Sequence, residues 1–143
     1  MDRERAKQLV DLLDEVIWRF GSQGSDGYCC EDISYVEYRT LKVLAKVGFL
    51  TMQQLGQQLG FTKSGATRVV DRLEAAGYVR RERSEYDHRV CCVTLTDAGR
   101  ELLERVVEEY ARKVEMSLER LDPDMQDVLM ASLRSFVRTF CGG

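Results

Sequence analysis

Residues 53–73, which read QQLGQQLGFTKSGATRVVDRL, constrain the fold more than any other stretch of the chain. Leu55, Leu59, Ala66 and Val69 follow the three-and-four spacing of helices, but Gly60 interrupts the pattern between the two pairs. Glycine tolerates the left-handed backbone that a tight turn between helices needs. The stretch therefore predicts two short crossing helices with the spacing of a helix-turn-helix.

The next segment, YVRRERSEYDHRVCCVTLT at 78–96, has a different periodicity. Val79 on one side, and Val93 and Leu95 on the other, favour extended strands. The charged run 84–89 between them is typical of a turn. We expect a β-hairpin, or wing, directly after the second short helix.

The rest of the chain favours helices. Ser34 and Thr51 are each followed three residues later by a glutamate or glutamine, Glu37 and Gln54, which is the capping-box pattern that begins a helix. We expect helices over residues 4–20, 34–47, 51–60, 62–76, 97–121 and 122–140. The sequence therefore predicts a mainly α fold with a small β-hairpin wing.

The helices at the two ends carry longer apolar stripes than one small lobe can cover. We assign 34–96 to a winged helix-turn-helix lobe, and 1–33 with 97–143 to a helical dimerisation region. Helices from two subunits that pack together would cover these stripes, which predicts a two-fold homodimer. The alternative is a monomeric helical bundle, in which the stripes cover one another.

The charge distribution restricts the partners. The net charge of −3 over 143 residues, taken alone, argues against a nucleic-acid partner. However, residues 51–96 hold seven basic and five acidic side chains, which leaves 14 basic and 19 acidic ones elsewhere. A locally cationic face is compatible with phosphate binding. The sequence has neither a long apolar run nor a signal-peptide core, so we expect a cytoplasmic protein without a membrane partner.

The second short helix begins with small and polar side chains, which would let its start enter the major groove of double-stranded DNA. Its hydroxyls and first-turn amides can bind phosphate, and Arg68 can reach a guanine edge. At the wing, Asp87 can orient the guanidinium of Arg89 toward a minor groove. Arginines of the first wing strand, which begin at Arg80, can bind flanking phosphates. The candidate DNA-binding residues are Lys63, Ser64, Thr67, Arg68, Arg72, Arg81, Arg83, Asp87 and Arg89.

Residues 55–103 resemble the MarR family of bacterial winged-helix regulators. The residues that carry the similarity are VDRLE at 70–74, Gly77, Asp87, Arg89, Leu95 and Thr96, with a long helix after them. The resemblance implies a homodimer, a pseudo-palindromic operator, and repression that a ligand, a metal or an oxidant relieves. It also implies that Ser64, Thr67 and Arg68 are the recognition-helix contacts. The wing contact that it implies is Arg89.

Five cysteines suggest thiol chemistry as a signal, because this number is high for a cytosolic protein. The chain has no CxxC pair and only one histidine, His88, which argues against a zinc finger. On a strand, Cys91 would face inward and Cys92 outward, so the two are poor joint ligands for one ion.

A second group of cysteines is better placed to converge. Cys29 and Cys30 follow a glycine-rich loop, and Cys141 ends the last predicted helix. The family resemblance implies that this loop and the end of the last helix both lie near the dimerisation region. This placement would bring the three thiols together. They would form a site for a soft metal ion or for oxidation. No cofactor is required by this hypothesis, and the alternative is a solvated loop and a frayed tail.

Other readings remain open. A small aromatic or phenolic effector would need a pocket, for which Trp18, Tyr35 and Tyr38, with Phe49, are candidate lining residues, although such aromatics are more often core. Control by protein abundance needs no effector. A winged helix can also bind protein instead of DNA. An enzyme is disfavoured, because Cys92 and His88 form the only nearby cysteine–histidine set and no pocket is implied there.

Overall fold

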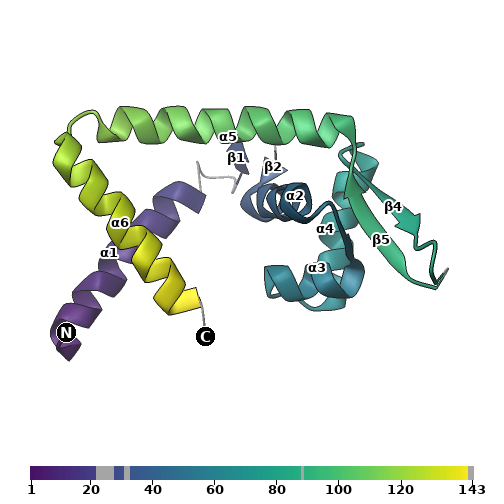
Figure 1. The fold of residues 1–143 in the computed structure, drawn as a ribbon, viewed down its shortest axis with the longest axis horizontal. Helices are drawn as coiled ribbons and strands as arrows, with labels where there is room; N and C mark the ends of the chain where they lie inside the picture. Colours follow the sequence, from purple (N-terminus) through teal and green to yellow (C-terminus); the bar gives the residue numbers. More distant parts are fainter. Residues whose placement is uncertain (22–27, 31–32, 88, 142–143) are drawn as a thin grey trace. The chain divides into compact units, whose positions relative to one another are not determined.

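The computed structural model describes residues 1–21, 28–30, 33–87 and 89–141, with the backbone alone at 21, 28–30 and 141. The chain forms two compact units, Met1–Val107 and Glu108–Gly143. The elements are α1 (Arg3–Gly21), β1 (Tyr28–Cys30), β2 (Ile33–Ser34), α2 (Tyr35–Val47), β3 (Phe49–Thr51), α3 (Met52–Leu59), α4 (Lys63–Ala75), β4 (Val79–Arg83), β5 (Cys91–Leu95), α5 (Asp97–Leu118) and α6 (Pro123–Cys141). The predicted mainly α fold with a hairpin wing is confirmed (Figure 1).

The helix-turn-helix consists of α3 and α4. Thr51 begins α3 with a complete capping box, in which its hydroxyl accepts from the Gln54 amide and the Gln54 side chain accepts from the Thr51 amide. Gly60 ends the helix at φ 71°, in the left-handed region that glycine adopts without strain. Thr62 then caps α4, because its hydroxyl accepts from the Gly65 amide at 3.2 Å. The expected caps and turn are therefore confirmed.

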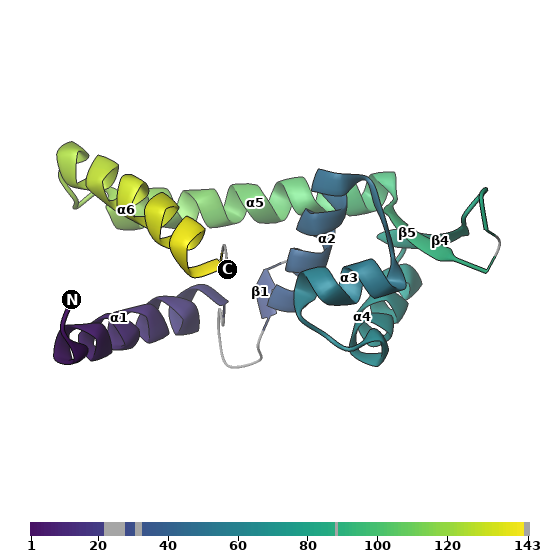
Figure 2. The same ribbon diagram turned by 60° about the horizontal axis from the view of Figure 1, so that its bottom comes forward.

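The wing is part of a three-stranded antiparallel sheet with the order β3-β5-β4. The hairpin β4–β5 was expected, but the outer strand β3 was not, because the sequence FLT between a glycine and a helix cap is too short for an alternating pattern. The short β1–β2 pair was missed for the same reason. Figure 2 shows that the hairpin extends beyond α4, so its tip is free to reach a partner.

The core of the first unit joins the helix-turn-helix to the sheet. Leu41 and Leu44 of α2, Leu55 of α3, and Val70 and Leu73 of α4 have exposed fractions of 1% or less. Val93 of β5 and Leu102 of α5 are equally buried. This packing fixes α4 against the sheet and leaves its opposite face in solvent.

The terminal helices keep apolar side chains exposed. In α1, these are Val10, Leu12, Val16, Ile17 and Trp18. In α6, they are Met125, Val128, Leu129, Met130, Leu133, Val137 and Phe140. No helix among the described residues is long and apolar enough to cross a membrane. The assignment of 1–33 and 97–143 to dimerisation remains a prediction.

Candidate nucleic-acid interface

The exposed face of α4 carries the residues that were expected to contact DNA. Ala66, Val69 and Val70 are buried, whereas Lys63, Ser64 and Arg68 are exposed. The half-buried Thr67 donates its hydroxyl to the Lys63 carbonyl at 2.8 Å, which leaves the lone pairs of its oxygen as acceptors. This face therefore offers hydroxyl groups, a lysine and an arginine at the start of one helix.

Arg72, further along α4, lies beside a buried acid. Its guanidinium Nη2 is 3.8 Å from Glu37 Oε1, and the Glu37 side chain is only 11% exposed while that of Arg72 is 62% exposed. The same Glu37 oxygen accepts from the Ser34 hydroxyl at 3.0 Å. Arg72 can thus balance a carboxylate at the start of α2 and still face solvent.

A single carboxylate organises the tip of the wing. The tip closes through the Ser84 amide, which donates to the Val90 carbonyl at 2.9 Å. Asp87 Oδ1 accepts from the Arg89 amide at 3.0 Å and from Arg89 Nε at 3.3 Å. The Arg89 side chain is nevertheless 93% exposed, so its remaining donors point to solvent. The expected orientation of Arg89 by Asp87 is present, while His88 lies outside the described residues.

The arginines of β4 are in different environments. Arg80 pairs with Glu82 on its own strand at 2.7 Å, and Arg83 is exposed. Arg81 instead binds two carboxylates of α4, Asp71 and Glu74. Desolvation alone would lower the pKa of Arg81, but the hydrogen bonds to Asp71 and Glu74 raise its pKa overall.

Three residues near this surface were not expected from the sequence. Asp71 and Glu74, both in the segment VDRLE, bind Arg81. The sequence signal for these contacts is an arginine that follows the two acids by ten and seven positions. Tyr86 at the wing tip is fully exposed, and no pattern in the charged turn indicated a role for it.

Of the five cysteines, the structure describes the side chains of Cys91 and Cys92. The side chains of Cys29, Cys30 and Cys141 lie outside the described part, so the three-thiolate hypothesis stays a prediction. Cys91 and Cys92 are both half-buried thiols. The expected exposure of Cys92 is wrong, because β5 is the central strand and Cys92 pairs with Thr51 and Glu82 on its two sides.

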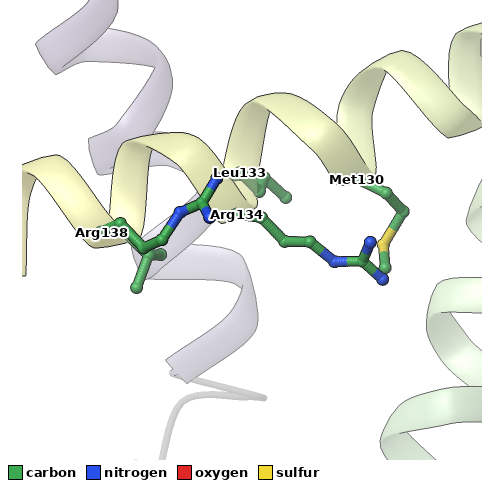
Figure 3. A pocket seen from close by; sticks show the side chains of 5 residues that line it. Met130, Leu133, Arg134 and Arg138 are labelled. Carbon is green, nitrogen blue, oxygen red and sulfur yellow. The ribbon is translucent and has the colours of Figure 1, made fainter.

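The candidate aromatic residues are in different environments. Tyr38 is buried in the core, with its ring centroid 5.7 Å from that of Tyr35, whereas Trp18 is 70% exposed. An open groove of about 440 Å³ lies on α6 instead. It is lined by Met130, Leu133, Arg134, Val137 and Arg138 (Figure 3). The aromatic pocket therefore remains a prediction.

Comparison with known proteins identifies a matching family model and a curated relative. A model described as the MarR family matches residues 31–90. The regulator YkoM of Bacillus subtilis, described as an HTH-type transcriptional regulator, is 33% identical over 98 residues, which are 68% of this chain and 64% of that protein. The chain thus spans less than two thirds of this curated relative.

Two solved structures are similar over nearly the whole chain. A MarR family protein from Bacillus stearothermophilus superposes with a TM-score of 0.86 at 25% identity, covering 99% of each chain. FabT of Streptococcus pneumoniae, solved in complex with DNA, superposes with a TM-score of 0.73 at 26% identity, covering 97% of each chain. Both superpositions include the wing and the terminal helices.

Proposed function

We propose, since the chain belongs to the MarR family, that it binds double-stranded DNA as a homodimer and regulates transcription. The observation that carries this proposal is the wing tip, where Asp87 holds Arg89 almost fully exposed beyond a helix-turn-helix. A guanidinium held in this way can enter a minor groove while the start of α4 enters the adjacent major groove. The FabT complex with DNA supports the same class of partner.

The homodimer is supported by the exposed apolar side chains of the terminal helices. Ile17 in α1 is 66% exposed and Phe140 in α6 is 75% exposed, which is costly for a monomer in water. A two-fold dimer would place two recognition helices on one DNA face, so its operator would be pseudo-palindromic.

We further propose repression that a thiol-directed effector relieves. The support is the five cysteines, of which Cys91 and Cys92 are free thiols at the end of β5 nearest the wing tip. Thiolates react with oxidants and bind soft metal ions. An aromatic effector is the alternative, but Tyr38, one of its candidate contacts, is buried in the core. Release of bound DNA should be measured against soft metal ions, a peroxide and phenolic acids, together with the thiol titre. Unchanged DNA binding and thiol titre with metal and peroxide would exclude thiol control.

DNA binding is tested by fluorescence anisotropy with labelled promoter-region fragments at two salt concentrations. A DNA-binding regulator should lose affinity steeply as salt rises, by about 1000-fold or more between 50 and 200 mM if it neutralises six or more phosphates. A protein-binding winged helix should show weak affinity and a shallow salt dependence. That second result would reject the proposed function.

A further inference from the structure

Arg81 connects the wing to the recognition helix. Its backbone amide donates to Glu74 Oε2 at 3.0 Å, and its guanidinium donates through Nη1 to Glu74 Oε1 at 2.7 Å. The other guanidinium nitrogen, Nη2, donates to Asp71 Oδ1 at 2.5 Å. One residue of β4 is therefore held by both oxygens of one α4 carboxylate and by a second carboxylate one turn earlier.

The position of Arg81 differs from that of other arginines of the wing. Its side chain is 25% exposed, against 63% for Arg80 and 93% for Arg89. Arg81 lies opposite Val93, which is fully buried, so its stem starts from the packed part of the sheet. Asp71 and Glu74 each occupy a donor of this guanidinium, and their negative charges repel a phosphate that approaches it.

The ion pairs of Arg81 join α4 to the strand that leads to the wing tip. Asp71 and Glu74 belong to α4, three and six residues after Arg68, while the strand that contains Arg81 leads to the tip with Arg89. The guanidinium bridges two carboxylates, through Nη1 to Glu74 and through Nη2 to Asp71, and its planar fork fixes the direction of both contacts as well as their distance.

We propose that Arg81, with Asp71 and Glu74, is a positioning device that holds the wing at a fixed angle to the recognition helix, and that Arg81 does not bind phosphate. The inference rests on the proposed DNA-binding function. It gives the two acids a role in DNA binding, although their charge opposes DNA.

Conservative variants separate positioning from phosphate binding. Glu74→Gln removes one negative charge near DNA, and the matched variant Glu82→Gln removes another from β4 without touching Arg81. If Arg81 positions the wing, Glu74→Gln should lower the affinity for DNA about fivefold or more. Glu82→Gln should leave this affinity unchanged or raise it slightly. Arg81→Lys keeps the charge but loses the fork, so it should bind as poorly as Arg81→Gln.

Two further measurements test whether the device acts through Arg89. In the Glu74→Gln background, Arg89→Ala should cost much less affinity than it does in the wild type, because the wing is already displaced. The exchanged pair Glu74→Arg with Arg81→Glu should regain at least part of the affinity that Glu74→Arg alone loses. Additive losses, tighter binding by Glu74→Gln, or wild-type binding by Arg81→Lys would overturn the proposal.

A test without DNA keeps this inference separate from the proposed function. Hydrogen exchange of the 79–95 backbone should accelerate in Glu74→Ala and stay unchanged in Glu82→Ala, at equal melting temperature of the helical core. Unchanged exchange in Glu74→Ala would overturn the positioning role even if the protein binds DNA. Accelerated exchange in a protein that does not bind DNA would support the device and reject only the proposed function.

Discussion

At the scale of the residue, two arginines of the wing illustrate what a sequence can reveal. The contact between Arg89 and Asp87 spans two positions within one turn, so the order of residues alone predicts it. The contacts of Arg81 with Asp71 and Glu74 span ten and seven positions and join a helix to a strand. They depend on how α4 packs against β4, which the sequence pattern does not specify. The sequence alone therefore predicts Arg81 as a phosphate contact, and its role as a positioning residue is proposed from the structure.

Arg68 and Arg89 should affect different parts of DNA recognition. Arg68→Ala should blur the preference for particular bases in the operator at a cost of about 1–3 kcal/mol, because the proposed function places this side chain at the major groove. Arg89→Ala should weaken binding by about 1 kcal/mol, mainly where the flanking minor groove is narrow. Affinities for a panel of operator variants measure both effects. Equal losses on every sequence for both variants would contradict these roles.

At the scale of the element, glycines decide how close two segments can approach. Gly99 lies in the first turn of α5, where a Cβ would be 2.0 Å from the Tyr78 carbonyl oxygen and 2.9 Å from its carbon. The same junction is held by the Thr96 hydroxyl, which donates to the Gly77 carbonyl at 2.6 Å. The start of α5 is thereby fixed to the base of the wing, which explains the glycine in DAGRELL.

Gly99→Ala should lower the free energy of unfolding by about 2 kcal/mol or more, because the clash with backbone outweighs the better helix propensity of alanine. The control is Gly65→Ala, whose Cβ would meet its nearest neighbours at 3.5 Å. That variant should keep or slightly raise stability. Thermal melts at equal protein concentration provide the comparison. A stable Gly99→Ala protein would show that α5 can shift away from Tyr78 at little cost.

Most elements were predictable because their signals are local. The caps at Thr51 and Thr62, the turn at Gly60 and the two wing strands all follow from residues within a few positions. The strand β3 was not predictable, since its pairing with β5 joins Phe49 to Thr94. This pairing makes β5 central, and it changes Cys92 from an expected surface thiol into a half-buried one.

At the scale of the whole molecule, the exposed apolar side chains are the feature that one chain leaves unexplained. The sequence predicted their helical spacing, and the structure places them at the surfaces of α1 and α6. Periodicity shows which face of a helix is apolar, but it does not show what covers that face. The partner chain is therefore a matter for measurement, and α6 is the clearest place to make it.

Leu133→Glu should separate the proposed dimer. Leu133 is 45% exposed on the apolar face of α6, and a carboxylate there would lose its hydration on dimerisation. The dissociation constant of the dimer should rise by about 100-fold or more, which is about 3 kcal/mol. Light scattering with size-exclusion chromatography measures it, and Ser135→Glu on the opposite face of the helix is the control.

Because each half of a pseudo-palindromic operator needs one recognition helix, the monomer should also lose affinity for the full site while retaining affinity for a half-site. A dimer that persists in Leu133→Glu, with unchanged affinity for the full site, would exclude this face of α6 from the interface.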